Sequence, residues 1–275
     1  MRRHLLALAL GLALVVGAAG PAYAEETEPS VPQIYIDGVL YEHPYTTVVD
    51  QVTYVSVHAM SKALLPEASL SWEHGLALVQ EEGLELSARP GDIYLCANGR
   101  YFYIPDGVRS AFDQDGVLVS ALVPVRTLAK ALSAAVTWED GAVQISSDGE
   151  PLVSGEEFYD PDALFLLSHV IYNESGNQPL KGKIAVGNVL LNRVRHPSFP
   201  DTLYDVVYQP GQFYPERTGC MQKTPNSGSI IAAKLCLEGA VVTANAYWFN
   251  GVGRSCWASQ HKTCLLVIGG HAFYG

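Results

Sequence analysis

The chain has 275 residues, a length that accommodates two domains of modest size. Hydrophobic residues make up 48% and charged residues 16%, a composition that forms packed cores and excludes a disordered chain. The formal net charge of -11 argues against nucleic acid or an anionic membrane as a partner, because phosphate binding requires clustered lysine and arginine side chains. Neutral or zwitterionic glycans are compatible with this charge.

The first 24 residues have the pattern of an export signal. Arg2 and Arg3 form a positive n-region, Leu5 to Val16 form a short apolar region, and Ala22-Tyr23-Ala24 is a small-x-small cleavage site. The apolar region is shorter than the ~20 residues that a membrane span needs. We therefore expect a secreted protein without a membrane span, whose mature chain starts near Glu25. An uncleaved membrane anchor is the alternative.

The N-terminal half contains an internal repeat. Residues 55–64 (VSVHAMSKAL) match residues 123–132 (VPVRTLAKAL), and each copy is followed by a Trp-Glu pair, at Trp72 and at Trp138. Within each block the apolar residues change from strand spacing to helix spacing. We expect both tryptophans to anchor the core of the repeat rather than to form sugar-binding platforms.

Turn signals complete the repeated unit. Asp37-Gly38 and Asn98-Gly99 lie between alternating apolar residues and predict two-residue hairpin turns. Each unit is then strand, turn, strand, helix, strand, turn, strand, and two units form one domain over residues 31–149. The polar, turn-rich residues 150–159 are predicted to be a linker, and residues 160–275 a second domain.

This N-terminal pattern resembles the copper amine oxidase N-terminal-like domain. The resemblance implies a structural or wall-associating role and no oxidase activity. We expect no copper site, because the histidines of this half are scattered and lack the spacing of metal ligands: His43, His58 and His74.

The C-terminal half opens with an amphipathic helix that carries a carboxylate at its end. Asp160 or Asp162 caps this helix and Gly176 ends it, and its apolar stripe consists of Leu164, Leu167 and Ile171. Glu174 lies in the last turn, where apolar surroundings and the negative end of the helix dipole both raise the pKa of a carboxyl group. Protonating a glycosidic oxygen requires such an acid. An exposed surface glutamate is the alternative.

Four of the five cysteines lie in this half. In an exported protein such clustering indicates two disulfides, for which three connectivities exist. We prefer Cys256 with Cys264, across a hairpin, and Cys220 with Cys236; buried free thiols are the alternative. Cys96 is expected to be a small buried residue. The absence of a C-x-x-C pair argues against zinc.

The remaining elements indicate an α+β layout, with helices first and a small antiparallel sheet last. In the second helix Gly187 allows close packing. The expected elements are a second helix over 184–195, a short helix over 201–208, a third helix from Thr224 to Gly239, and strands over 246–250, 264–268 and 269–274.

Seven collinear stretches between residues 173 and 273 resemble the cell wall hydrolase family of the spore cortex-lytic enzymes. They are residues 173–179 (NESGNQP), 182–194 (GKIAVGNVLLNRV), 198–200 (SFP), 207–213 (VYQPGQF), 224–226 (TPN), 247–250 (YWFN) and 268–273 (IGGHAF). The resemblance implies a small lysozyme-like fold related to lytic transglycosylases, with Glu174 as the catalytic acid/base. Here Gln178 replaces the family's second acidic residue, and Gly270 stands where the family often has Asn.

The implied reaction needs a single carboxyl group. Glu174 would protonate the glycosidic oxygen between N-acetylmuramic acid and N-acetylglucosamine, then accept a proton from the attacking C6 hydroxyl, leaving a 1,6-anhydro end. A muramidase-type hydrolase on the same fold would need a second carboxylate ~5–9 Å away. Its candidates are Asp201, Asp205 and Glu216, of which Asp201 is predicted to cap a helix. A non-catalytic peptidoglycan-binding protein is a third possibility.

Five further residues are predicted to line the cleft: Gln212, Phe213, Thr224, Tyr247 and Asn250. Amides and hydroxyls can hold acetamido groups, and aromatic rings can stack on sugars. We expect no metal or cofactor and take His271 as structural. The expected partner is the glycan strands of peptidoglycan, at the cell wall or spore cortex; no protein partner is indicated.

Overall fold

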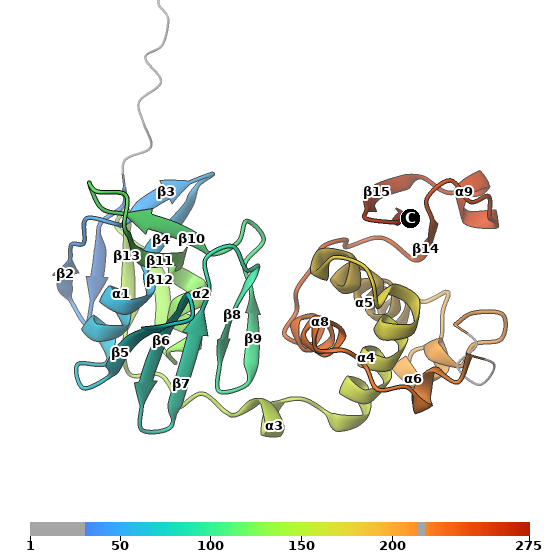
Figure 1. Ribbon diagram of the computed structural model, residues 1–275, viewed down its shortest axis with the longest axis horizontal. Helices are drawn as coiled ribbons and strands as arrows, with labels where there is room; N and C mark the ends of the chain where they lie inside the picture. Colours follow the sequence, from blue (N-terminus) through green and yellow to red (C-terminus); the bar gives the residue numbers. More distant parts are fainter. Residues whose placement is uncertain (1–30, 214–217) are drawn as a thin grey trace, which may run out of the picture. The chain divides into compact units, whose positions relative to one another are not determined.

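The computed structural model describes residues 31–213 and 218–275, so the predicted export signal and Glu216 lie outside the described residues. Figure 1 shows a N-terminal half made mainly of strands and a C-terminal half in which helices precede a small sheet. Val31–Gly275 form one unit. Of the helices described between residues 31 and 275, none has the length and apolar character needed to cross a bilayer.

Three sheets make up the described N-terminal half. Their strand orders are β12-β13-β1-β2, β10-β11-β4-β3 and β5-β6-β7-β8-β9, and β1 runs parallel to β13 while the other neighbours are antiparallel. The strands are β1 (Ile34–Ile36), β2 (Val39–Tyr41), β3 (Thr47–Val49), β4 (Val52–Ser56), β5 (Ser69–Glu73), β6 (Leu76–Glu81), β7 (Leu84–Ala88), β8 (Tyr94–Ala97), β9 (Arg100–Tyr103), β10 (Arg109–Phe112), β11 (Leu118–Pro124), β12 (Ala135–Glu139) and β13 (Ala142–Ser146).

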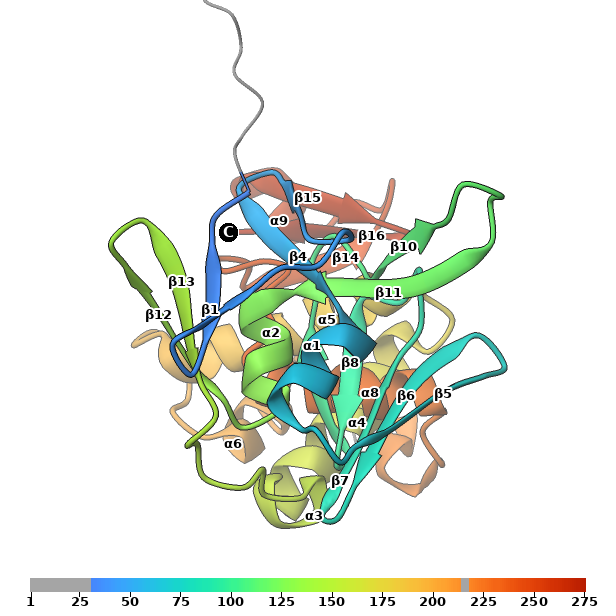
Figure 2. The ribbon, with the colours of Figure 1, turned by 90° about the vertical axis from the view of Figure 1, so that its left-hand side faces the viewer.

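Both copies of the sequence block form the same order of elements. The first is β4, α1 (Val57–Leu64), β5 and β6, and the second is β11, α2 (Val125–Ala131), β12 and β13. Figure 2, in which this half faces the viewer, shows both helices amid the strands. Met60 of α1 and Leu128 of α2 are fully buried in one common core.

The hairpin turns lie where the sequence predicts them. Asp37-Gly38 joins β1 to β2 and Asn98-Gly99 joins β8 to β9, with φ of 49° and 79° in the first turn and 49° and 74° in the second. Positive φ at both central residues is the geometry of a type I′ turn, which matches the twist of paired strands. Asn and Asp tolerate this region better than other non-glycine residues, which explains the composition of both turns.

The prediction that Trp72 and Trp138 anchor the core is wrong. Their side chains are 37% and 55% exposed. They lie on β5 and β12, each of which is the outer strand of its sheet. On the same strands Leu70 and Val136 pack against the core, while both indole rings remain largely at the surface.

The segment predicted to be a linker contains a short helix, α3 (Gly155–Phe158), and contacts the β8–β9 hairpin. The amide of Gly155 donates to the Asn98 carbonyl at 2.8 Å, and the amide of Tyr101 donates to the Tyr159 hydroxyl at 3.1 Å. From β9, Arg100 forms a bidentate ion pair with Glu238, with N–O distances of 2.6 and 3.0 Å. These contacts join strand β9 to the C-terminal helices.

In the C-terminal half, three helices pack against one another: α4 (Pro161–Ser175), α5 (Leu180–Arg195) and α8 (Ser227–Leu237). The short helices α6 (Leu203–Val207) and η1 (Cys220–Gln222) lie against them. The predicted close approach at Gly187 is confirmed. A Cβ there would lie 2.6 Å from Cys236 Sγ and 3.1 Å from Ile171 Cδ1, so any side chain would force the helices apart.

The predicted disulfides are not formed, and all five cysteines are free thiols. Cys236 is buried in the contact between α5 and α8, where its Sγ lies 3.5 Å from the Ile184 carbonyl oxygen, while Cys220 is buried in η1. Cys256 and Cys264 are separated by a helix rather than a hairpin, and the Cys256 thiol accepts from the Ser259 amide at 3.4 Å as a helix cap. Cys236 and Cys220 are thus packed in buried positions, and Cys256 caps a helix.

The chain then forms a three-stranded antiparallel sheet, which confirms the predicted α+β layout of this half. Its strands are β14 (Trp248–Gly251), β15 (Cys264–Ile268) and β16 (His271–Tyr274), and β16 lies between the other two. Helix α9 (Trp257–His261) is inserted between β14 and β15. Phe273 on β16 is fully buried against the helical core.

Candidate functional site

Glu174 lies in the last turn of α4, as the sequence predicts. Asp160, and not Asp162, caps this helix: its carboxylate accepts from the Ala163 amide at 2.7 Å, and Pro161 occupies the first helical position. Helix α4 is buried on the side of Leu167 and Ile171, which fixes the helix against its neighbours. Glu174 therefore extends from a rigid element.

The C-terminal end of α4 is held by a buried lysine that the sequence analysis missed. Lys183 Nζ donates to the carbonyl oxygens of Ser175, Gly176 and Gln178 at 2.8, 2.7 and 2.9 Å. The ammonium group satisfies carbonyls that a helix end leaves free and opposes the negative end of the helix dipole. Burial lowers the pKa of Lys183. A lysine between Gly182 and Ile184 on the buried face of α5 is the sequence signal that could have revealed it.

Asn173 and Lys223 determine the hydrogen bonding and the charge around the Glu174 carboxyl group. Asn173 Nδ2 donates to Glu174 Oε1 at 2.9 Å, and Lys223 Nζ donates to Asn173 Oδ1 at 3.0 Å. Because the lysine occupies the amide oxygen, the Asn173 NH₂ group is the part that faces the carboxyl. Burial of the half-buried Glu174 raises its pKa, while the Asn173 hydrogen bond and the Lys223 charge act against that rise. The direction is the one expected from the sequence, with burial as its main cause.

A cleft of about 1070 Å³ lies beside Glu174. This exceeds the ~300–1,000 Å³ typical of small-molecule sites, so the cleft has room for an oligomeric ligand. Its walls come from the end of α4, from β14, from α9 and from the turn before β16. The lining residues are Glu174, Asn177, Gln178, Arg193, Gly211, Gln212, Phe213, Thr218, Trp248, Phe249, Asn250, Gly251, Val252, Arg254, Cys256, Trp257, Ala258, Gly270 and His271.

A second hollow of about 620 Å³ shares Glu174 and Asn177 with this cleft. Its other lining residues include Asn173, Lys223 and Asn226. Glu174 thus belongs to the walls of both hollows, so a polymer occupying both would pass the carboxyl group.

Three of the predicted cleft residues line the same cleft as Glu174: Gln212, Phe213 and Asn250. Arg193 fixes the Gln212 amide, with Nη1 donating to Gln212 Oε1 at 2.8 Å. Asn250 Nδ2 donates to the Arg254 carbonyl at 3.2 Å. Phe213 is 9% exposed and contributes mainly to the helical core.

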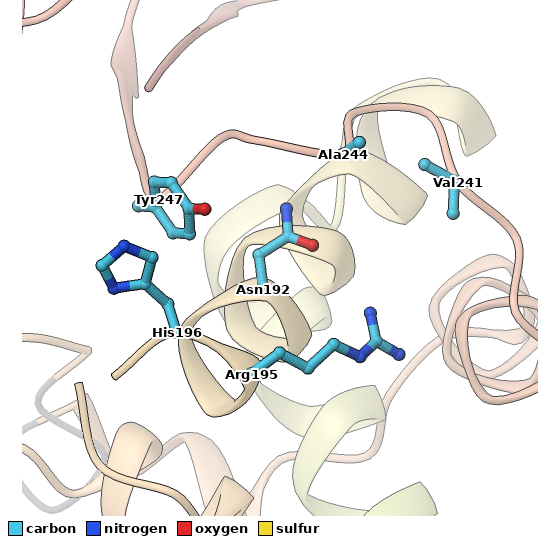
Figure 3. A pocket seen from close by; sticks show the side chains of 6 residues that line it. All are labelled: Asn192, Arg195, His196, Val241, Ala244 and Tyr247. Carbon is cyan, nitrogen blue, oxygen red and sulfur yellow. The ribbon is translucent and has the colours of Figure 1, made fainter. Parts of the chain in front are cut away.

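The other two predicted residues lie elsewhere. Tyr247 lines a separate hollow of about 200 Å³ at the end of α5, where its ring packs against His196 with centroids 4.7 Å apart (Figure 3). Thr224 is exposed in the segment between η1 and α8, and neither hollow beside Glu174 has it in its lining. Asn226, two residues further on, is the one that reaches the site: its Nδ2 donates to the Gly176 carbonyl at 3.0 Å.

The candidates for a second carboxylate do not line the described part of the cleft. The prediction that Asp201 caps a helix is wrong, because Thr202 caps α6 by accepting from the Asp205 amide at 3.1 Å. The Asp205 carboxylate in turn accepts from the Thr202 hydroxyl at 2.6 Å. Glu216 lies outside the described residues. Among the described lining residues, Glu174 is the one carboxyl group.

Most of the described lining residues were not assigned to the cleft from the sequence, among them Trp248, Arg254, Trp257 and His271. We expected His271 to be structural, yet it contributes to the cleft wall, with its ring 5.4 Å from that of Phe249. Burial lowers its pKa, which favours the neutral ring. In residues 31–213 and 218–275, no three His, Cys, Asp or Glu side chains gather as metal ligands would.

The sequence of the C-terminal half is similar to those of cell wall hydrolases and spore cortex-lytic enzymes. Residues 177–274, which begin just beyond Glu174, match the family model described as Cell Wall Hydrolase. Over 117 residues the chain is 36% identical to a spore cortex-lytic enzyme of Bacillus cereus, a match that covers 42% of this chain and 45% of the relative. It is 31% identical over 127 residues to a spore cortex-lytic enzyme of Oceanobacillus iheyensis, covering 46% of each. The chain thus spans less than half the length of these relatives.

Two solved structures are also similar to this region. The catalytic domain of the Bacillus cereus SleB protein is 29% identical, with 42% of this chain and 92% of that chain covered and a TM-score of 0.40. The catalytic domain of the germination-specific lytic transglycosylase SleB from Bacillus anthracis is 27% identical, with 45% and 100% covered and a TM-score of 0.40.

Proposed function

We propose that this protein degrades peptidoglycan by cleaving the bond between N-acetylmuramic acid and N-acetylglucosamine, with Glu174 as the acid/base. The observation that carries the proposal is the half-buried Glu174 carboxyl group, with its raised pKa, in the walls of two adjoining hollows. The match of residues 177–274 to the Cell Wall Hydrolase family supports it. So do the spore cortex-lytic relatives.

The reaction follows from one carboxyl group acting twice. Burial raises the pKa of Glu174 and so favours its protonated form, which donates its proton to the glycosidic oxygen as the bond to the anomeric carbon breaks. The resulting carboxylate then accepts the proton of the C6 hydroxyl, whose oxygen bonds to the same anomeric carbon. The first proton stays on the hydroxyl of the departing sugar, the proton of the C6 hydroxyl restores the Glu174 carboxyl group, and the product carries a 1,6-anhydro ring. Asn173 Nδ2, 2.9 Å from Oε1, stabilises the carboxylate formed between the two steps.

The lytic route is favoured over hydrolysis by the composition of the cleft. A hydrolase of the inverting or retaining type uses a second carboxylate to activate water or to attack the sugar. Among the described lining residues Glu174 has no carboxylate partner, whereas the lytic route needs none. A non-catalytic peptidoglycan-binding protein would use the same cleft without any need for a protonated carboxyl group.

Digestion of purified peptidoglycan followed by mass spectrometry separates these functions. We expect 1,6-anhydro-muramyl ends from the wild-type protein and none from Glu174→Gln, with Glu156→Gln, an exposed change on α3, as the matched control. Reducing ends would indicate a hydrolase. Intact glycan with retained binding would leave only the binding function, and an active Glu174→Gln variant would remove this residue from the mechanism.

The proposal extends to the place where the protein acts and to the role of its N-terminal half. A glycan substrate of this kind lies outside the cytoplasmic membrane, which agrees with the export signal predicted for residues 1–24. We propose that the protein acts at the cell wall or spore cortex. The N-terminal residues 31–149 would then associate with the wall, in line with the resemblance to the copper amine oxidase N-terminal-like domain.

A further inference from the structure

One wall of the cleft presents two tryptophans that the acid/base chemistry does not use. Trp248 lies on β14 and Trp257 begins α9, and their ring centroids are 5.6 Å apart with an angle of 59° between the planes. Both line the same cleft as Glu174. Two adjoining indole rings in an open cleft form an apolar surface for a ligand with a flat apolar face.

The Trp257 ring is exposed yet held in place. Its side chain is 56% exposed. It stacks on the His261 imidazole one helical turn later, with centroids 5.2 Å apart and planes 14° from parallel. His261 Nδ1 lies 2.8 Å from the Trp257 carbonyl oxygen, which fixes the imidazole beneath the indole. A ring fixed in this way loses little conformational entropy when a ligand stacks on it.

The charge of the cleft is opposite to that of the whole chain. The chain carries a net charge of -11, yet the described lining residues include two arginines and a single carboxyl group, Glu174, whose pKa is raised. Arg193 is buried and its guanidinium is engaged by Gln212 and the Tyr247 carbonyl. Arg254 is exposed, and none of the described acidic side chains forms an ion pair with it.

The Arg254 side chain packs against Gly251, the last residue of β14. A Cβ at Gly251 would lie 3.2 Å from Arg254 Cδ and 3.4 Å from its Nε, so the side chain lies across the glycine. Asn250 Nδ2 fixes the Arg254 backbone by donating to its carbonyl. A cation is therefore placed on the strand that also carries Trp248.

We propose that Trp257 and Arg254 form a saccharide subsite that selects a sugar bearing a carboxylate, such as an N-acetylmuramic acid unit whose lactyl or peptide substituent is ionised. The apolar face of the sugar ring stacks on the Trp257 indole, and the guanidinium of Arg254 binds the carboxylate through charge-assisted hydrogen bonds. This subsite rests on the proposed function, because it holds the same glycan that Glu174 cleaves.

Binding is measured by calorimetry in a Glu174→Gln background, so that the ligand stays intact. The two probes are a peptidoglycan tetrasaccharide with free carboxylates and the same tetrasaccharide after amidation. We expect Trp257→Ala to weaken binding of both probes about tenfold, or about 1.4 kcal/mol, and Trp257→Phe to recover part of that loss. Arg254→Gln should weaken only the free-carboxylate probe, again about tenfold. Tyr204→Ala, an equally exposed aromatic side chain on α6 that is absent from the described lining of both hollows beside Glu174, is the control that should change nothing.

Each outcome decides one point. Unchanged affinity in Trp257→Ala would overturn the stacking surface. Equal losses for both probes in Arg254→Gln would overturn the selection of a carboxylate. Glycan cleavage by the wild-type protein is measured separately, so an enzyme that cleaves peptidoglycan while Trp257→Ala binds normally would refute the subsite and leave the proposed function standing.

Discussion

Replacing Lys183 by methionine tests whether the fold holds Glu174 in place. Methionine keeps most of the buried apolar volume and removes the ammonium group that donates to three carbonyls at the end of α4. Hydrogen bonds from a charged group contribute about 1.5–3 kcal/mol each. The Ser175 carbonyl also accepts from the Gln178 amide, and the Gly176 carbonyl accepts from Asn226, so both keep a second donor. Removing a buried charge also recovers desolvation free energy.

The net loss of folding free energy should therefore be about 3 kcal/mol, well below the sum of three bonds. For a chain of this size that corresponds to a fall in Tm of about 6–12 °C. The last turn of α4 should also loosen and move Glu174 relative to its substrate, so kcat should fall about 10–100-fold while KM changes little. Calorimetry and the peptidoglycan assay measure the two effects.

Lys181→Met is the matched control, since Lys181 lies on the same helix and is exposed. We expect its Tm and kcat to match those of the wild-type protein. If the two variants behaved alike, or if Lys183→Met lost stability while its kcat stayed unchanged, the reasoning that the ammonium group positions the acid/base would be refuted.

Two further predictions follow from the raised pKa of Glu174. As pH rises above the pKa of an unfolded glutamate, the unfolded chain ionises before the folded protein, so stability falls until pH passes the folded pKa of Glu174. Glu174→Gln should remove that loss, so its stability should fall less than that of the wild type between pH 4 and pH 7, as measured by urea unfolding at both pH values. Lys223→Met removes a charge that lowers this pKa, so the alkaline limb of the pH–activity profile should move to higher pH. A limb that stayed in place or moved to lower pH would show that Lys223 does not act on the carboxyl group.

Local signals predicted much of the fold. The Asp160 cap, the end of α4 near Gly176 and the close packing at Gly187 each depend on a few neighbouring residues whose preferences no distant contact overrides. The Asp37-Gly38 turn is of the same kind, because the required positive φ restricts the choice of residues. Patterns of this type correctly predicted that Glu174 lies in the last turn of a helix.

The errors lie where tertiary contacts decide the outcome. The cysteine spacing suggested disulfides, but Cys236 lies in a helix contact and Cys256 caps a helix that the spacing did not reveal. Tyr247 was assigned to the cleft, yet its ring packs beside His196, while the next residue, Trp248, lines the cleft. Tyr247 precedes β14, whose residues 248–251 all line the cleft, so the start of the strand separates the site residues from this neighbour.

The strand order of the last sheet has a consequence for how the protein is made. Strand β16 pairs with β14 on one side and β15 on the other, and its residues follow both partners in the sequence. A chain that emerges from the ribosome N-terminus first therefore gains this central strand after both of its partner strands. Until residues 271–274 are free to insert, β14 and β15 have no common neighbour and the wall with Trp248 is incomplete. The cleft wall that the proposed activity needs is therefore formed only after β16 has joined the sheet.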